Sequence, residues 1–298
     1  MKLKHPFLSN KVEIPKNHSD DVDNIRSWLA HQPHLPKLTD EHIMMFLHSC
    51  YYSGERTKTT IDNYYTVRAQ CSDLFTGWTW DVLKSSFDMY TMTQLPRLTP
   101  EGYRVLLYRL RDPDPSKLVF NDALKTFFAF NDVCISEDGL LAGYVVVFDM
   151  KGLCLGHLAR VSTCMNAVRK FMIYIQDCHP VRLKGVHVIN TFSLIDKILC
   201  LVKPLMQSDL IQLLHLHPDV NTLNEFVPLD ILPLDYGGTT KHTEELHKDT
   251  TQLIETKYLK WLEQSEAYTA DLKKRIGKPR SQLIGLELEG SFKSLSFD

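Results

Sequence analysis

The chain has 298 residues, of which 44% are hydrophobic and 23% charged, and its formal net charge is -2. This length predicts one large or two modest domains, the composition is that of an ordinary globular protein, and the charge balance gives no indication of nucleic-acid binding. The seven cysteines contain no C-x-x-C pair, and no apolar run reaches transmembrane length. We therefore expect a cytoplasmic protein without a zinc site.

The first part of the chain predicts a small helical domain. We expect residues 1–19 to be an irregular leader and residues 20–95 to hold helices that begin near Asp20, Asp40 and Gly54, with a further helix over 80–90. The first three helices carry apolar stripes and are joined by short loops, which favours an antiparallel bundle. Residues 95–100 contain two prolines and predict a linker.

The second predicted domain, residues 96–268, alternates strands with helices. Strands are expected over 103–110, 143–148, 180–189 and 210–216, and helices over 116–135, 161–176 and 242–268. The run GYVVVF at 143–148 is typical of a strand that is buried on both faces. The alternation predicts an α/β fold with a mostly parallel β-sheet flanked by helices.

The stretch from His187 to His217 contains an unusual helix, expected between Thr191 and Lys203. Its polar residues form only a narrow stripe, and apolar side chains cover the rest. A helix that is apolar nearly all round is either buried or faces another apolar medium. The pattern leaves two interpretations open: a buried crossover helix between two strands, or a lid over an apolar cavity.

Aromatic residues are concentrated on the helix expected over 116–135. It carries more Phe residues than one core-facing stripe needs, and Asn131 lies four residues after Phe127 on the same face. A few polar groups in a mostly apolar lining are typical of a small-molecule cavity. A plain hydrophobic core is the alternative interpretation of the same stripe.

Motifs for catalysis are missing from the sequence. It contains no G-x-S-x-G, G-x-x-x-x-G-K-[ST], H-E-x-x-H or G-x-G-x-x-G, so we expect neither an enzyme nor a bound cofactor. His215 and His217 alternate on one strand face, where they suit either a metal ion or packing against each other, and we expect packing. Asp235 lies in a turn and is interpreted as a carboxylate that binds backbone amides, with a catalytic base as the alternative.

The C-terminal residues 269–298 are expected to form a basic tail. The run KKRIGKPR at 273–280 holds five Lys or Arg residues and no acid. Contact with phosphates or anionic lipid and a simple solvated tail are both compatible with this run.

The order of three features resembles the CRAL-TRIO family of cytosolic carriers of hydrophobic ligands, in particular its tocopherol and retinaldehyde carriers. The first is the helical bundle with the run Asn63–Tyr65 before Arg68. The second is GYVVVFDMKG at 143–152. The third begins with VHVIN at 186–190 and continues through Lys203-Pro204, His215-Leu-His217 and LPLDYGG at 232–238. The matched region covers roughly residues 20–265, and the motifs are specific in combination.

The resemblance implies a monomeric, non-enzymatic carrier that binds one hydrophobic small molecule, such as a retinoid, tocopherol or carotenoid, and contacts membranes transiently. The implied cavity is lined by Phe127, Phe130, Asn131, Tyr144, Tyr174, His179 and Val186, with Asn131 and His179 as the orienting polar groups. The helix between 192 and 206 becomes a mobile gate, with Phe192, Ile195, Ile198, Leu199 and Val202 on its apolar face.

The resemblance also implies a surface contact with phosphoinositides through Arg182 and Lys184, which precede Gly185. Other basic positions of the family's pattern are replaced here, for example by His48 and Cys50. Two further functions stay open as alternatives: a phosphatidylinositol or phospholipid exchange protein, and a lipid-dependent scaffold for a protein partner.

Overall fold

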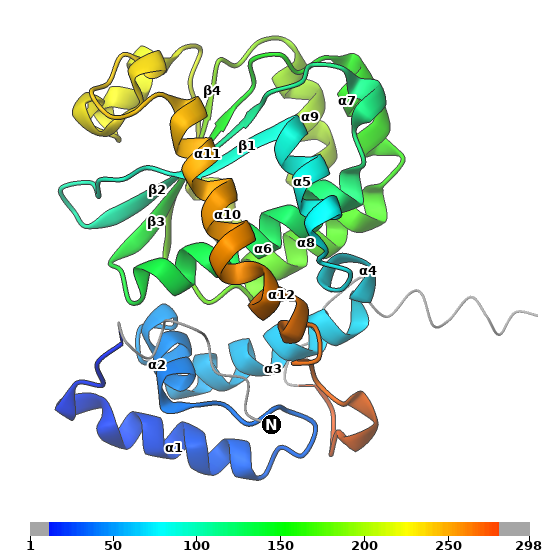
Figure 1. Ribbon diagram of the computed structural model, residues 1–298. Coiled ribbons are helices and arrows are strands. Elements are labelled where there is room, and N and C mark those ends of the chain that lie inside the picture. Colours follow the sequence, from blue (N-terminus) through cyan, green and yellow to red (C-terminus); the bar gives the residue numbers. More distant parts are fainter. Residues whose placement is uncertain (1–11, 280–298) are drawn as a thin grey trace, which may run out of the picture.

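The computed structural model describes residues 12–279 of the chain. The predicted leader up to residue 11 and the predicted basic tail from residue 280 lie outside the described residues. A helical bundle forms one end of the described part, and a sheet flanked by helices forms the other (Figure 1). The predicted α/β fold class, with a helical bundle before a mostly parallel sheet, is confirmed.

Three helices build the bundle: α1 (Ser19–Ala30), α2 (Asp40–Ser49) and α3 (Gly54–Gln70). The start of α2 follows from its sequence, because the Thr39 hydroxyl accepts a hydrogen bond from the His42 amide at 3.4 Å. Buried apolar side chains from all three helices form one cluster around Ile43 and Phe46. The short helix α4 (Ser72–Phe75) leads from the bundle to the second domain.

The sheet has five strands in the order β1-β2-β3-β4-β5, with bounds Tyr90–Gln94, Tyr103–Leu110, Gly143–Asp149, Leu183–Ile189 and Leu214–Leu216. β1 runs antiparallel to β2, and the other neighbours are parallel. Tyr108 pairs with Phe148, and Phe148 pairs with Val188. Because side chains alternate along a strand, these residues share one face of the sheet, which we call the aromatic face.

Helices cover both faces of the sheet. The aromatic face packs in one cluster with α5 (Trp80–Met89), α6 (Phe120–Asp138) and α8 (Met165–Asp177), and α7 (Leu155–Ser162) and α9 (Leu194–Val202) lie on the same side (Figure 1). The opposite face is covered by α11 (Thr243–Leu253) and by three 3-10 turns, Val220–Glu225, Leu229–Ile231 and Leu234–Tyr236. Further short helical turns are Lys16–His18, Pro115–Lys117, Lys203–Leu205 and Leu272–Lys274.

Three features of local structure differ from the predictions. The helix expected over 80–90 is confirmed as α5, but the strand β1 directly after it was not predicted. β1 has two buried threonines and packs on α11 through a contact between the Thr93 and Thr250 hydroxyls at 3.0 Å. The single helix expected over 161–176 is divided into α7 and α8. Side-chain hydroxyls cause this break, because Thr163 donates to the Arg160 carbonyl at 2.7 Å and so competes with the helical bonds.

The third difference concerns residues 210–216, which were expected to form one strand. They contain most of the helix α10 (Ser208–Gln212) followed by the three-residue strand β5. The amide of Gln207 donates to the Gln176 side chain at 2.6 Å, which fixes the chain where α10 begins. The expected final helix is interrupted by a π turn, Ile254–Tyr258, and then resumes as α12 (Leu259–Ser265). Within residues 12–279, no helix is both long and apolar enough to cross a membrane.

Candidate functional site: an apolar gate over an aromatic seam

The helix α9 lies at the surface with most of its apolar side chains only half covered. Leu194 is buried, whereas Phe192 is 42% exposed. Ile195, Ile198, Leu199 and Val202 are half-buried. α9 is a crossover helix between the parallel strands β4 and β5, as one interpretation expected, but it lies half-buried at the surface rather than in the core.

The two ends of the gate segment, residues 192–206, are held by polar contacts. At the first end, the amide and hydroxyl of Thr191 donate to the His217 carbonyl at 3.1 and 2.8 Å. At the second end, the Gln176 amide group of α8 donates to the Leu205 carbonyl at 3.1 Å. Apolar contacts hold the second end as well, where Val202, Leu205 and Met206 pack against the protein, so the segment is attached at both ends to the rest of the domain.

An apolar seam lies beneath the gate, between its second end and α8. Val202, Leu205 and Met206 pack against a cluster formed by Val168, Met172 and Leu210. Partly buried side chains join this cluster to the large core under the aromatic face: Phe120, Phe171, Ile175 and Leu183. The seam is therefore the place where the gate meets the aromatic core.

The structure brings the predicted lining residues close to this seam, although to different depths. Phe130, Tyr144 and Tyr174 are buried in the large core, and Phe127 packs against it from the side. Val186 belongs to the cluster under the gate. Phe127 stacks on Tyr108 with a centroid distance of 5.1 Å, so it lies on the aromatic face and borders the seam.

The two predicted polar residues of the lining are both uncharged. The side-chain nitrogen of Asn131 donates to the Tyr108 hydroxyl at 3.0 Å and to the Phe127 carbonyl at 2.7 Å, so the oxygen of its amide is the group left for a ligand. Burial lowers the pKa of His179 to about 3, with the nearby Arg68 charge as the second cause. His179 is neutral at physiological pH, and its ring lies 5.7 Å from that of Tyr174.

Tyr174 has a structural role that the sequence did not reveal. Its hydroxyl accepts hydrogen bonds from Arg68 at 3.2 and 2.6 Å, and the same guanidinium binds both oxygens of Asp132 at 2.8 Å. Arg68 is 5% exposed and connects α3 of the bundle to α6 and α8 of the sheet domain. The Tyr174 hydroxyl is thus committed to the contact between the domains.

Arg182 and Lys184 lie side by side on a loop tyrosine of the bundle. Arg182 places its guanidinium 4.2 Å from the centre of the Tyr51 ring and donates to the His48 carbonyl at 2.7 Å. Lys184 donates to the Tyr51 hydroxyl at 2.9 Å. Tyr51 is 53% exposed and has a positive φ of 54°, an uncommon conformation for a non-glycine residue. No sequence signal indicated that this tyrosine would engage both cations.

His215 and His217, which were expected to pack against each other, each pack against His187. The His187 ring stacks on those of His215 and His217 with centroid distances of 4.9 and 5.2 Å, and its Nδ1 lies 3.0 Å from His217 Nε2. Among residues 12–279, no group of three His, Cys, Asp or Glu side chains is arranged to hold a metal ion. This histidine cluster joins β4 to β5 at the end of the gate segment.

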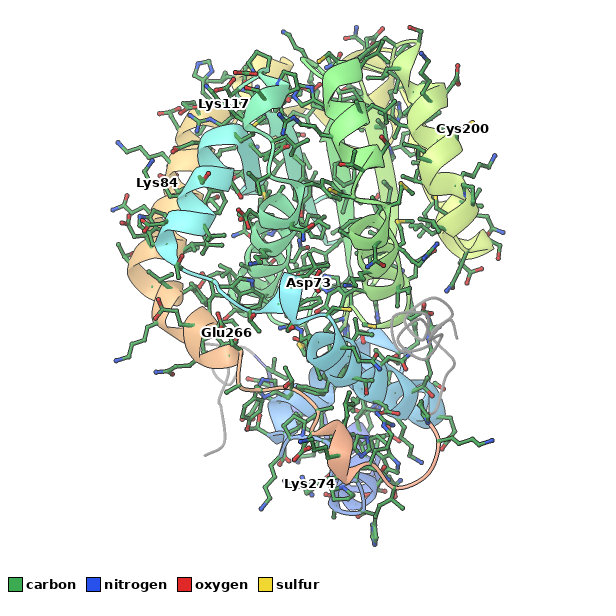
Figure 2. The ribbon with its side chains drawn as sticks, turned by 90° about the vertical axis from the view of Figure 1, so that its right-hand side faces the viewer. Asp73, Lys84, Lys117, Cys200, Glu266 and Lys274 are labelled. Carbon is green, nitrogen blue, oxygen red and sulfur yellow. The ribbon has the colours of Figure 1, made fainter. Side chains whose placement is uncertain are left out.

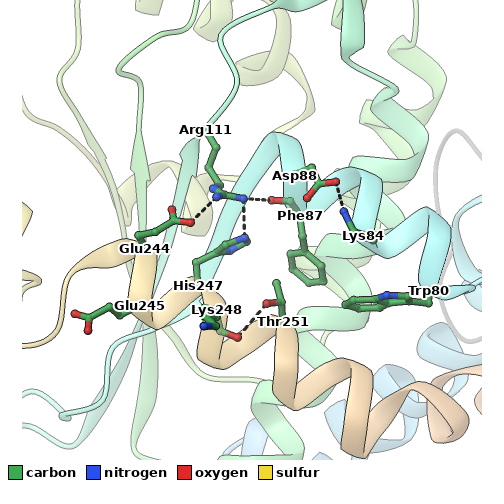
Figure 3. Close-up of a pocket in the computed structure, with 10 residues that line it drawn as sticks. All are labelled: Trp80, Lys84, Phe87, Asp88, Arg111, Glu244, Glu245, His247, Lys248 and Thr251. Atoms are coloured by element: carbon green, nitrogen blue, oxygen red, sulfur yellow. Dashed lines mark hydrogen bonds and ion pairs between the residues drawn. The ribbon is translucent and has the colours of Figure 1, made fainter.

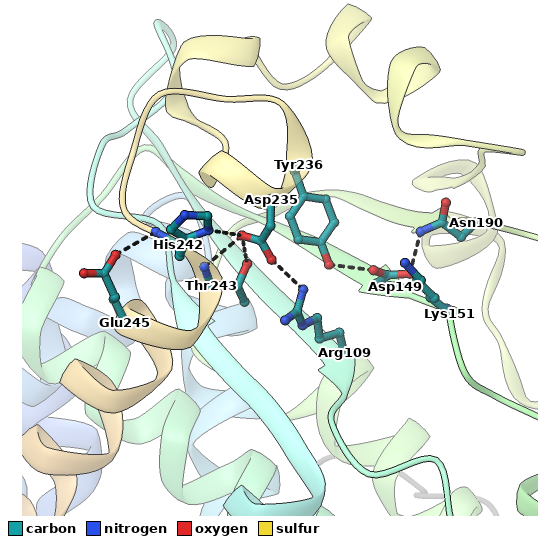
Figure 4. A network of polar contacts seen from close by, with 9 residues as sticks. All are labelled: Arg109, Asp149, Lys151, Asn190, Asp235, Tyr236, His242, Thr243 and Glu245. Atoms are coloured by element: carbon teal, nitrogen blue, oxygen red, sulfur yellow. Dashed lines mark hydrogen bonds and ion pairs between the residues drawn. The ribbon is translucent and has the colours of Figure 1, made fainter.

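Two carboxylates order the loops at the carboxyl ends of the strands (Figure 4). Asp149 accepts hydrogen bonds from the Tyr236 hydroxyl at 2.6 Å and from the Asn190 amide at 2.7 Å. Asp235 accepts from Arg109 at 2.7 Å and from the Thr243 amide at 2.9 Å, at the start of α11. Asp235 therefore has the backbone-binding role expected from its turn.

A hollow of about 310 Å³ lies away from the gate, between α5 and α11 (Figure 3). Its charges are paired within the protein: Arg111 donates to Glu244 at 2.6 Å, and Lys84 to Asp88 at 2.6 Å. A second hollow of about 40 Å³ lies beside Arg68, between the two domains. Neither hollow is lined by a residue of the gate or by a predicted orienting residue.

The described part of the chain is an α/β protein in which a helical bundle precedes a mostly parallel sheet and an apolar helix lies at the surface. Residues 88–238 match the family model described as CRAL/TRIO domain, and residues 14–80 match the model described as Pinta-like, UBA domain. The chain belongs to the CRAL/TRIO family of lipid-binding and lipid-transfer proteins. The resemblance drawn from the sequence is confirmed.

The sequence identity between this chain and individual relatives is low. The chain is 27% identical over 231 residues to "Alpha-tocopherol transfer protein-like" of Mus musculus and of Homo sapiens, which covers 76% of this chain and 67% of either relative. It is 22% identical over 234 residues to "Clavesin-1" of Xenopus laevis, covering 76% and 70%. Among solved structures, "Crystal structure of Sfh5" aligns with a TM-score of 0.47 and 10% identity over 79% of this chain and 92% of that chain.

Proposed function

We propose that the protein is a non-enzymatic cytoplasmic carrier that binds one hydrophobic small molecule and transfers it between membranes, with a retinoid, tocopherol, carotenoid or similar isoprenoid as cargo. The observation that supports this proposal most directly is the gate. It is a surface helix with half-covered apolar side chains, held by polar contacts at its ends and lying over an aromatic seam. Membership of a lipid-transfer family supports the same function.

The proposed binding site is the seam between the aromatic face, α8 and the gate. Phe127 and Val186 are half-buried there, so movement of the gate away from α8 would expose their side chains to an incoming ligand. Phe130, Tyr144 and Tyr174 would form the deeper wall. Apolar side chains of this kind provide most of the affinity for a hydrophobic ligand, and a few polar groups orient it.

The polar groups at the seam favour a cargo without a charged headgroup. Asn131 offers a neutral oxygen, and His179 is uncharged because burial lowers its pKa to about 3. The Arg68 guanidinium is paired with Asp132 and Tyr174. These contacts suit a hydroxyl or carbonyl group better than a phosphate, which would require unpaired cations.

The contact with phosphoinositides is a separate part of the proposal. Arg182 and Lys184 are the residues we propose for it, and a phosphate would have to replace their contacts with Tyr51. Tyr51→Ala would free both cations, so it should tighten binding to vesicles that contain a phosphoinositide. Weakened binding by this variant would instead mean that the Tyr51 ring itself contacts the membrane.

Native mass spectrometry of the purified protein, followed by organic extraction, tests the proposal. We expect one bound hydrophobic molecule per chain, and a monomer. Competition between a fluorescent retinoid and liposomes with phosphatidylinositol then separates the two kinds of cargo. Uptake of phosphatidylinositol without uptake of the retinoid would indicate a phospholipid exchange protein. If the protein takes up neither lipid, it is not a carrier, and the scaffold interpretation remains.

A further inference from the structure

The C-terminal turn, residues 271–279, forms an exposed corner of the bundle that combines apolar and basic side chains. Ile276 is 75% exposed, the highest value given for a large apolar residue among residues 12–279, and Leu272 is 38% exposed. Lys273, Lys274 and Lys278 are exposed around them. We call these residues the basic corner.

Buried contacts anchor the basic corner to the bundle. Arg275 binds both oxygens of Asp62 at 2.9 and 2.7 Å and the Thr66 hydroxyl at 2.5 Å. The Asp271 amide donates to the His34 carbonyl at 2.8 Å. Asp62 is 3% exposed, so this anchor is shielded from water. The expected tail therefore begins with a fixed turn, and none of these anchoring contacts involves the side chains of Leu272 and Ile276.

The charge of the corner is positive after its internal pairs are counted. Residues 271–279 carry four Lys or Arg residues and the acid Asp271. Asp271 pairs with Lys274 at 2.8 Å, and Asp62 pairs with Arg275. Lys273 and Lys278 then provide uncompensated positive charge beside the exposed Ile276, and Lys37 is exposed on the neighbouring loop that accepts a hydrogen bond from Tyr268.

The basic corner and the gate lie at opposite ends of the molecule. In Figure 2, Lys274 marks the corner beside the bundle in the lower part of the molecule, and Cys200 marks α9 in the upper part of the sheet domain. Figure 1, seen at 90° to that view, separates the same two segments in the same way. A membrane that contacts the gate would therefore leave the corner free.

We propose that the basic corner is a second membrane contact, in which Ile276 and Leu272 enter the interface of an anionic bilayer while the lysines contact lipid headgroups. Apolar side chains flanked by lysines are the combination that binds anionic lipid surfaces. Because the corner is distant from the gate, one molecule can contact two membranes at once. This inference goes beyond the transfer of cargo, which requires only the gate.

Vesicle binding by the full-length protein tests the proposal. Ile276→Asp should lower the affinity for phosphatidylcholine–phosphatidylserine vesicles, measured by sedimentation, by about tenfold. The substitution removes an aliphatic side chain that the bilayer would bury and adds a negative charge that anionic lipids repel. It should leave the thermal midpoint and the uptake of cargo unchanged, since Ile276 makes no buried contact. Val119→Asp is the matched control, because Val119 is 55% exposed and lies directly before α6, outside the corner.

A vesicle-clustering assay, with clustering measured by light scattering, tests whether one molecule contacts two membranes. The wild-type protein should cluster anionic vesicles, and either Ile276→Asp or the gate variant Leu199→Asp should abolish clustering while single-vesicle binding persists. The proposal is wrong if Ile276→Asp binds and clusters vesicles as the wild type does, or if Val119→Asp is equally defective. Equal binding to pure phosphatidylcholine would likewise refute the role of the lysines.

Discussion

Replacing Leu199 by aspartate tests whether α9 is a gate. Leu199 lies in the third turn of the gate segment and is half-buried, so part of its side chain packs toward the protein and part faces outward. An aspartate at this position places a charge on the apolar face. Cys200→Asp is the matched control, because Cys200 is exposed on the same helix and receives the same charge one residue further along.

The expected magnitudes follow from this half-buried state. Complete burial of a leucine side chain contributes roughly 1.5–3 kcal/mol, so the covered half contributes about 1 kcal/mol to the free energy of unfolding. If the exposed half enters a membrane, its loss costs a similar amount, which corresponds to about a fivefold change in membrane affinity. Desolvation of the new carboxylate increases this loss.

Transfer of a fluorescent hydrophobic ligand between donor and acceptor vesicles measures the effect. Leu199→Asp should slow transfer at least fivefold and lower the free energy of unfolding in urea by only about 1 kcal/mol, whereas Cys200→Asp should change both much less. Equal transfer by Leu199→Asp and the wild type would refute the assignment of the gate. Equal defects in the two variants would show that charge anywhere on α9 matters, rather than its apolar face.

Three further predictions concern stability. Arg68→Met leaves the Asp132 carboxylate buried and unpaired and should lower the free energy of unfolding by about 3–5 kcal/mol in urea titrations, and adding Asp132→Asn should restore much of the loss. His187 is 2% exposed, and burial, with the neighbouring imidazoles as a smaller cause, lowers its pKa to about 4 from the usual 6.5. As the pH falls, the unfolded chain therefore takes up a proton at this histidine before the folded chain does. Through His187 alone, the free energy of unfolding should fall by at most about 1.4 kcal/mol per pH unit as the pH decreases from about 6.5 to about 4. Since His42, His48 and His247 have similarly lowered pKa values, His187→Asn should remove one such contribution from the total pH dependence in denaturation measured across that range. Asp235→Ala should cost about 1–3 kcal/mol in the same urea titrations and leave the transfer rate of the folded protein unchanged, whereas complete loss of activity in a stable variant would favour a catalytic base.

Those parts of the fold that depend on strong local patterns were predictable from the sequence. The strand 103–110 was predicted with its observed bounds, and 143–148 with one residue fewer, because a continuous apolar run is typical of a strand buried between helices. The strand β1 was missed although its Tyr and Thr residues favour strands, because five residues directly after a helix make too short a pattern. Pairing with β2 and packing against α11, which is more than 140 residues later, stabilise it.

The sequence predicted the kinds of residue that form the candidate site, but not the contacts that these residues make with the rest of the chain. The apolar character of α9 and the aromatic residues of α6 are visible in the sequence. The contact between Arg68 and Tyr174 joins residues 106 positions apart, and that between Lys184 and Tyr51 joins residues 133 apart. Such long-range polar contacts depend on how the domains pack, and a single sequence carries no periodic signal for them.

If α9 is the gate that we propose, the contacts around it would keep it closed in water and allow it to open at a membrane. Ile195, Ile198, Leu199 and Val202 are each half-buried, so lifting the helix into water would cost about 1 kcal/mol for each side chain, or about 4 kcal/mol in all. That cost corresponds to an open population of about one in a thousand. A bilayer surface offers an apolar environment to the same side chains and removes most of the cost. The polar contacts at Thr191 and Leu205 lie at the ends of the segment, so they need not break when its middle moves.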